Sequence, residues 1–135
     1  MSLVDPIVFE GGHPAVLVRR AAQVIGAHAY RWSSEADLQA ALAAVLEPRC
    51  ATVEREHRLA AADRLDFLLL GTIAVEVKLH GSATALLSQV QRYCDHPSIG
   101  ACLVVTPSRR LAAGWPETLR GKPVAAVLVR RVGGL

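Results

Sequence analysis

Residues 64–80 limit the fold of this chain most strongly, because two apolar runs of strand length, residues 65–70 and 72–79, flank a single glycine. Runs of this kind on either side of Gly71 predict two strands joined by a tight turn. The same runs contain three charged residues, Asp66, Glu76 and Lys78. Charges inside apolar strands are costly to bury without partners, so their placement has to be explained.

Side chains alternate between the two faces of a strand, so Glu76 and Lys78 point to one face and the apolar residues around them to the other. A hairpin centred on Gly71 places Asp66 opposite Glu76, since both lie five residues from the glycine. Opposed residues share a face, with Cβ atoms roughly 5 Å apart. The pairing depends on register, because a two-residue turn would move Asp66 to the other face.

The rest of the chain supplies helices and further strands. Ser34 and Asp37 match a capping box, which predicts a helix over residues 34–47 that Pro48 stops. A second helix is predicted over residues 82–95. The remaining predictions are strands at residues 51–59, 101–105 and 123–131, a short helix at 111–115 and a short strand at 4–9, while 15–29 fits a helix or an extended segment.

The predicted order is helix, three strands in a meander, helix, strand. A helix that crosses from the third strand to the fourth makes that pair parallel and gives a mixed sheet covered by helices, an α/β three-layer αβα sandwich. The 135 residues are expected to form one domain, 1–135. Residues 34–106 contain this order of elements and form its core, and residues 1–33 are an N-terminal extension whose structure the pattern leaves undecided.

Composition narrows the class of protein without deciding its partner. Hydrophobic residues make up 52% of the chain and charged residues 20%, which is typical of a compact, core-rich protein. A net charge of +3 is compatible with a polyanionic partner and also with none. Cys50, Cys94 and Cys102 form no metal-binding spacing, and neither a signal peptide nor a membrane span is evident, so we expect a cytoplasmic protein that does not enter a membrane.

Two carboxylates and an ammonium on one face suggest a metal site. Like charges that close are unfavourable unless a cation lies between them. Mg²⁺ or Mn²⁺ suits one or two carboxylates completed by water and phosphate oxygens, and the carbonyl of Val77 offers a further oxygen. Lys78 would then stabilise charge on a phosphate. The alternative is an ordinary salt bridge on a solvated strand face, the usual fate of Glu-x-Lys.

The arrangement Asp66-x9-Glu76-x-Lys78 on a hairpin, preceded by a helix and followed by a helix and a strand, resembles the PD-(D/E)xK nuclease superfamily, whose core is αβββαβ. Here Arg64-Leu65-Asp66 replaces the usual Pro-Asp. The resemblance implies a restriction-endonuclease-like fold, in which Asp66 and Glu76 bind the metal and Lys78 is the catalytic lysine.

The two helices carry further residues of the resemblance. Glu35 falls within the buried stripe of the first helix, where many of these nucleases have an acidic metal ligand; complementing the helix dipole is an equally good explanation. Gln89 and Tyr93 match the Q-x-x-x-Y motif of the RecB-like branch, in which the glutamine organises the active site and the tyrosine lies near nucleic acid. The four-cysteine cluster of some RecB-like nucleases is absent, so no iron–sulfur cofactor is implied.

The resulting expectation is a small metal-dependent nuclease that acts on DNA. Arg55, Arg92 and Arg109 are expected to help bind the nucleic acid, and His80, two residues beyond Lys78, is the one histidine near the site. A module that keeps the nuclease fold but only binds nucleic acid or protein is the alternative. A homodimer or a partner subunit is a third expectation, because the chain is short.

Overall fold

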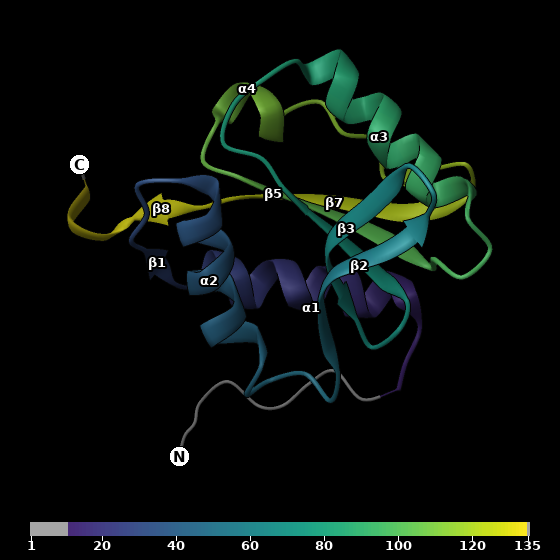
Figure 1. Ribbon diagram of the computed structural model, residues 1–135, viewed down its shortest axis with the longest axis horizontal. Coiled ribbons are helices and arrows are strands. Elements are labelled where there is room, and N and C mark those ends of the chain that lie inside the picture. Colours follow the sequence, from purple (N-terminus) through teal and green to yellow (C-terminus); the bar gives the residue numbers. More distant parts are fainter. Residues whose placement is uncertain (1–10, 135) are drawn as a thin grey trace.

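A computed structural model describes residues 11–134 and shows an α/β fold (Figure 1). The strand predicted at residues 4–9 lies outside the described residues. The helices are α1 (Pro14–Gly26), α2 (Glu35–Leu46), α3 (Ala83–Asp95) and α4 (Arg109–Ala112), with a 3-10 turn at Val132–Gly134. The strands are β1 (Ala29–Tyr30), β2 (Val53–Ala60), β3 (Asp63–Leu69), β4 (Ile73–Val77), β5 (Ala101–Thr106), β6 (Thr118–Leu119), β7 (Lys122–Leu128) and β8 (Arg130–Arg131).

Six of these strands form one open, mixed sheet in the order β2-β3-β4-β5-β7-β6. Strands β2, β3 and β4 are an antiparallel meander, whereas β4, β5 and β7 run parallel to one another. The predicted meander and the predicted parallel crossover through α3 are therefore confirmed. A separate parallel pair joins β1 to β8.

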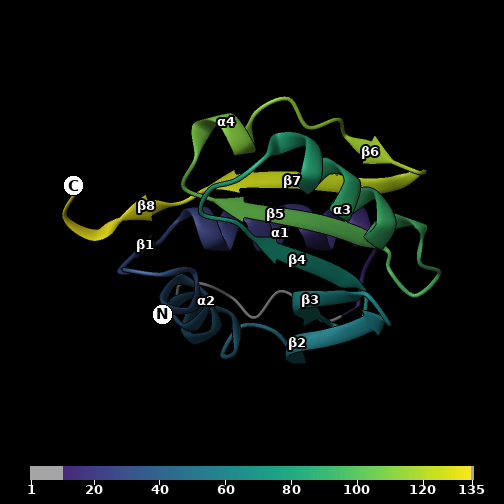
Figure 2. The same cartoon turned by 45° about the horizontal axis from the view of Figure 1, so that its top comes forward.

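Helices cover both faces of the sheet (Figure 2). On one face α1 and α2 pack against residues such as Phe67, Val75 and Leu103. On the other face α3 and α4 pack against a second cluster, which includes Ala74 and Val104. Side chains that alternate along β4 and β5 thus contribute to two cores, one on each face of the sheet. This arrangement is compatible with the predicted three-layer sandwich.

Most of residues 15–29, predicted as either helical or extended, form helix α1, Pro14–Gly26, with Pro14 in its first turn. Pro is favoured there because the first N–H groups of a helix have no intrahelical partner. The helix packs on β5 and β7 and contributes Leu17 and Ile25 to the core, so this part of the predicted extension belongs to the main fold. Gly100 permits the close approach: a Cβ there would lie 2.8 Å from Cγ of Pro14 and would also meet Thr72.

Helix α2 begins where the capping residues predicted. The Ser34 hydroxyl accepts the Asp37 N–H at 3.1 Å, and Asp37 in turn accepts the N–H of Ser33 at 2.9 Å. The short helix predicted at 111–115 instead spans Arg109–Ala112, because Ser108 caps it by accepting the Leu111 N–H at 3.3 Å.

The strand predicted at 123–131 is divided. After β7 ends at Leu128, the chain continues into β8, which leaves the main sheet and pairs with β1.

Cys50, Cys94 and Cys102 are buried free thiols, as expected of small core residues, and the Sγ atoms of Cys94 and Cys102 lie 3.4 Å apart. No helix within residues 11–134 has the length and apolar character needed to cross a membrane.

Candidate active site

The hairpin between β3 and β4 has the predicted register. Phe67 pairs with Val75 and Leu69 with Ile73, so each pair is centred on Gly71. Leu70 and Gly71 make the turn with positive φ angles of 56° and 69°. Asp66 and Glu76 occupy the next opposed positions, one step beyond the last paired residues.

At that step β3 and β4 separate, and we call this place the fork, defined by Asp66, Glu76, Val77 and Lys78. On one side β4 stays bonded to β5, since the Lys78 N–H donates to the Val105 carbonyl at 2.9 Å. On the other side its N–H groups have lost β3 as a partner.

At the fork, carboxylate oxygens accept the N–H groups of β4 and the residues after it that β3 no longer bonds. Asp66 Oδ2 accepts the Val77 N–H at 2.7 Å, and Glu35 Oε1 accepts the Leu79 N–H at 3.3 Å. Buried backbone donors need a partner, so both acidic side chains stabilise the open end of β4. Glu35, predicted on the core side of its helix, reaches the fork from the first turn of α2. This contact brings Glu35 to the predicted site.

The Val77 carbonyl faces the same gap. In an extended strand the N–H and C=O of one residue point to the same neighbouring strand. Because the Val77 N–H donates to Asp66, the carbonyl also points towards the side that β3 has left. The fork therefore brings together two carboxylates and one backbone carbonyl.

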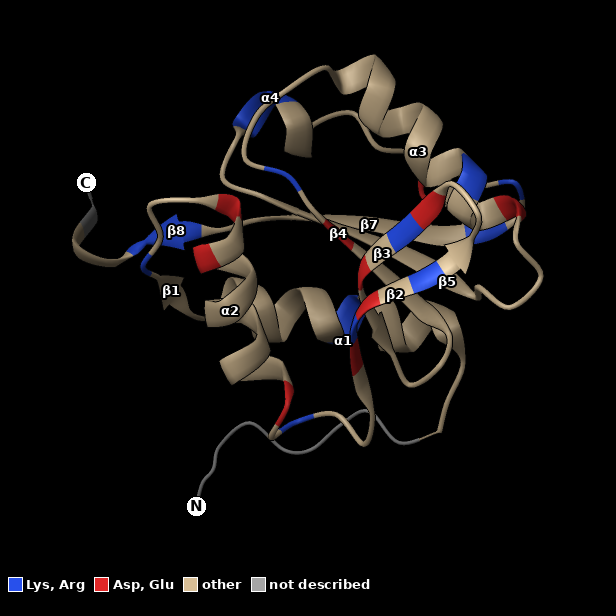
Figure 3. Cartoon of the chain, in the orientation of Figure 1, with Lys and Arg blue, Asp and Glu red and all other residues tan. Residues whose placement is uncertain are grey.

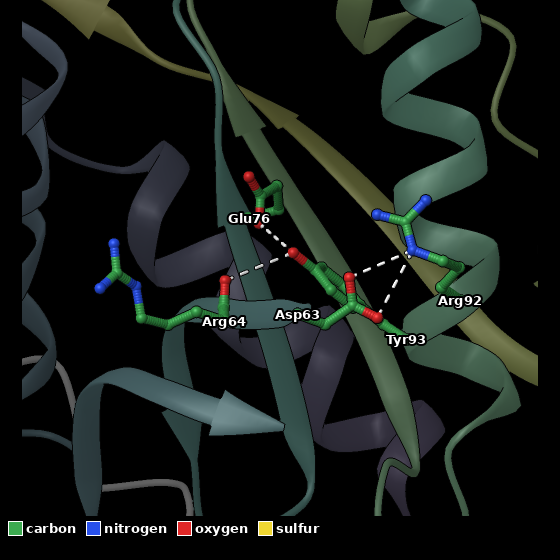
Figure 4. Close-up of polar contacts among 5 residues, drawn as sticks. All are labelled: Asp63, Arg64, Glu76, Arg92 and Tyr93. Atoms are coloured by element: carbon green, nitrogen blue, oxygen red, sulfur yellow. Dashed lines mark hydrogen bonds and ion pairs between the residues drawn. The ribbon is translucent and has the colours of Figure 1, made fainter. Parts of the chain in front are cut away.

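Glu76 is buried, with 5% of its surface exposed, and Tyr93 holds it from α3. The Tyr93 hydroxyl donates to Glu76 Oε1 at 2.9 Å and lies 3.5 Å from the Arg64 carbonyl (Figure 4). Tyr93 is itself only 1% exposed. The expected contact between Tyr93 and nucleic acid therefore does not fit this structure, in which the tyrosine belongs to the core stripe of α3 and orients Glu76.

Burial and mutual repulsion make the two carboxylates hard to ionise. Desolvation by burial, with the charge of Asp66 as the next cause, raises the pKa of Glu76 to about 8. Burial likewise raises the pKa of Asp66 to about 6, with a further contribution from Glu35. Lys78 and the hydrogen bonds from Tyr93 and Val77 act in the opposite direction. A cation at the fork would favour the ionised forms of both groups.

Lys78 and Gln89 line one cavity of about 460 Å³, on the α3 side of the sheet. The predicted lysine and glutamine thus lie around a common space, although they come from different elements. His80 and Arg92 line it as well, and Arg92 forms an ion pair with Asp63 at 3.1 Å (Figure 4). Nothing in the sequence pattern marked Asp63, because an acidic residue at the start of a strand is common.

The other two predicted arginines lie elsewhere. The Arg55 guanidinium lies 5.7 Å from the ring centroid of Phe67, whose side chain belongs to the core on the opposite face of the sheet. The structure therefore does not bring Arg55 to the cavity. Arg109 is exposed at the start of α4, after β5.

Glu56, which the sequence did not single out, has a positive φ of 51° within β2. Its neighbours Arg55 and His57 pair with Phe67 and Leu65, so Glu56 lies across from Asp66. A non-glycine residue rarely adopts this conformation in a strand. The distortion lies beside the place where β3 stops pairing with β4.

Within residues 11–134 no three His, Cys, Asp or Glu side chains are grouped closely enough to form a metal site by themselves. Glu35 lies close enough for its charge to act on both Asp66 and Glu76, and its role as a third metal ligand stays a prediction. The chain matches no protein-family model, no curated protein and no solved structure. Its function has to be inferred from the chemistry of the fork.

Proposed function

We propose that the protein is a metal-dependent nuclease that hydrolyses phosphodiester bonds in DNA, with the fork as its active site. The observation that carries the proposal is the buried Glu76 beside Asp66, with Lys78 two residues further along the chain, directly after β4. An abandoned site has no reason to keep carboxylates that repel each other in a buried position. The succession α2-β2-β3-β4-α3-β5 also has the order of the restriction-endonuclease-like core, which supports that finer fold as part of the proposal.

The donor set at the fork fits Mg²⁺ or Mn²⁺. Asp66 uses Oδ2 for the Val77 N–H, and Glu76 uses Oε1 for the Tyr93 hydroxyl. No hydrogen bond within residues 11–134 engages the second oxygen of either group, so each can face an ion. With the Val77 carbonyl this gives three hard oxygen ligands, a number that leaves positions for water and a phosphate oxygen. When bound, such an ion lowers the pKa of a coordinated water and offsets phosphate charge.

The protein's own residues have distinct roles in this proposal. Lys78 lines the cavity, and its ammonium would stabilise negative charge that develops on the phosphate. Gln89 lines the same cavity and offers an amide for orienting the attacking water or a phosphate oxygen. Tyr93 and Glu35 are positioning residues, because they hold Glu76 and the end of β4.

A binding module that keeps the fold without chemistry is the second candidate. One observation favours it: Asp66 and Glu35 accept backbone N–H groups, a structural role that they would keep without a metal. Titration calorimetry with Mn²⁺ separates the two candidates. Binding that Glu76→Gln abolishes supports the enzyme, and absence of binding supports the module.

The activity test is a gel assay with labelled duplex, single-stranded and branched DNA, with and without Mg²⁺ or Mn²⁺. We expect metal-dependent cleavage that falls by about 100-fold or more in Asp66→Asn, Glu76→Gln and Lys78→Met, since each removes a charge aimed at the reacting phosphate or its metal. Glu54→Gln, at an exposed carboxylate on β2, is the matched control and should cleave like the parent. Equal cleavage by the parent and the three fork variants would refute the assignment.

A further inference from the structure

The carboxyl ends of the parallel strands β4, β5 and β7 meet at one edge of the sheet, and basic residues follow each of them. Lys78 follows β4, Arg109 and Arg110 follow β5, and Arg130 and Arg131 follow β7. We call the four arginines the basic edge. Figure 3 shows basic residues on α4 and on β8 at the same end of the molecule as the coil that leaves β4. Ligands of open α/β sheets bind outside the carboxyl ends of such strands.

The basic edge differs in its partners from three other exposed arginines. Arg64, Arg92 and Arg120 form ion pairs with carboxylates at 3.6, 3.1 and 3.7 Å. By contrast, no arginine of the basic edge forms an ion pair with any acidic residue of the described chain, and all four are exposed. Their charges are therefore available to a polyanion in solution.

Two of these arginines are held in place by groups that carry no charge. Arg110 Nη2 donates to the Gly81 carbonyl at 2.7 Å, and the Arg131 guanidinium lies 4.4 Å from the ring centroid of Trp32. Such contacts order a long side chain without neutralising it, which lowers the entropy lost on binding. Gly81 also lines the cavity that contains Lys78, so the basic edge begins beside the proposed active site.

The acidic residues of the neighbouring helix form no ion pair with the basic edge in the described chain. Glu35 and Asp37, in the first turn of α2, accept the backbone N–H groups of Leu79 and Ser33.

Neighbouring strands lie about 4.8 Å apart, so the distance from β4 to β7 is about 10 Å. That is the length of about three nucleotides at about 3.4 Å each.

We propose that the basic edge binds the phosphate backbone of the DNA strand and leads it from the fork across the carboxyl ends of β5 and β7. The inference rests on the proposed function and adds to it the path of the substrate. It places the strand on the side of Arg109 and Arg131, away from Arg55, which stacks on Phe67 across the sheet.

The test is the affinity of the full chain for a fluorescein-labelled DNA oligonucleotide, measured by anisotropy in a chelator so that nothing is cleaved. We expect the double variant Arg109→Glu/Arg131→Glu to bind at least tenfold more weakly. The slope of log affinity against log salt should become shallower by about 2, because each lost phosphate contact removes about 1 from it. Arg109→Gln/Arg131→Gln gives the same slope change with less repulsion and serves if the first variant fails to fold.

Arg120→Glu is the matched control. Arg120 is exposed and just precedes β7, at the opposite end of that strand from the basic edge. It should bind DNA as the parent does. Equal affinity and salt slope in the parent and both double variants would overturn the basic edge, as would a parent that binds no DNA.

A small substrate separates this inference from the proposed function. Bis(4-nitrophenyl) phosphate with Mn²⁺ tests the fork alone, because it has no strand to lie on the edge. Double variants that hydrolyse it like the parent but cleave DNA poorly support both proposals. A parent that binds DNA through the edge and hydrolyses neither substrate supports the edge and refutes the nuclease.

Discussion

Glu76 is the residue on which the proposed chemistry depends. A carboxyl group with 5% of its surface exposed is stable only when it is neutral, paired or bound to a cation. Tyr93 supplies one hydrogen bond, and Asp66 adds a repulsive charge. In the absence of a bound cation, the folded protein should therefore favour the protonated, neutral form of Glu76.

The raised pKa of Glu76 predicts how the stability of the folded protein depends on pH. The pKa of Glu76 rises from 4.5 in an ordinary setting to about 8 in the folded chain. The folded state then binds more protons than the unfolded state between these values, so the stability from this group is full below about pH 4.5 and is lost as pH rises through about 8. We expect the melting temperature, measured in a chelator, to fall between pH 5 and pH 8, and to fall less steeply in Glu76→Gln.

Some slope should persist in that variant, because burial also raises the pKa of Asp66 to about 6. Glu54→Gln, which changes an exposed carboxylate, should keep the slope of the parent. Identical slopes in the parent and Glu76→Gln would show that Glu76 ionises freely.

At the scale of elements, the sequence predicted the hairpin and its register well. Alternating apolar residues around Gly71 leave one register that buries Val75 and Val77, since a slip by one residue would turn them to the wrong face. The predicted opposition of Asp66 and Glu76 followed from that register. Ser34 likewise marked the start of α2, because a capping hydroxyl acts through local contacts that a sequence contains.

Long-range contacts explain what could not be predicted. The pattern of residues 64–80 does not say where β3 and β4 separate, because the distortion at Glu56 belongs to a third strand. Tyr93 was expected near nucleic acid, whereas the packing of α3 on the sheet buries it. The pairing of β1 with β8 joins segments about 100 residues apart, and strands of two residues carry no periodic signal.

The fork itself yields a prediction for Asp66. In Asp66→Asn the amide oxygen can still accept the Val77 N–H, while the charge that repels Glu76 disappears. We expect this variant to be more stable than the parent at pH 8 in a chelator, when stability is measured by urea unfolding. Asp66→Ala should instead lose about 1–3 kcal/mol relative to Asp66→Asn, because the Val77 N–H is left unpaired.

Both variants should lose metal affinity, so gain of stability and loss of binding would coincide in Asp66→Asn. That combination is typical of an active-site residue kept at the expense of stability. If Asp66→Asn proved no more stable than Asp66→Ala, the role of Asp66 as acceptor for β4 would be wrong.

The whole molecule places opposite charges next to each other at one edge of an open sheet. The fork gathers carboxylates where β3 separates from β4, and the basic edge continues along the ends of the parallel strands β5 and β7. A polyanionic substrate would be attracted by the arginines and repelled by the carboxylates. A cation at the fork removes that conflict, so metal and substrate are expected to support each other's binding.

Metal binding should therefore be visible in the stability of the whole chain. An ion that binds only the folded state stabilises it by RT ln(1 + [L]/Kd), about 2.7 kcal/mol at 100 times Kd. For a domain of this size each kcal/mol raises the melting temperature by roughly 3–4 °C, so saturating Mn²⁺ should raise it by roughly 10 °C. The rise should be larger at pH 8 than at pH 6, since the ion competes with the protons that Glu76 and Asp66 hold. Differential scanning calorimetry measures it, and Glu76→Gln should abolish the rise while Glu54→Gln preserves it. An equal rise in the parent and Glu76→Gln would place the ion elsewhere and remove the fork as the metal site.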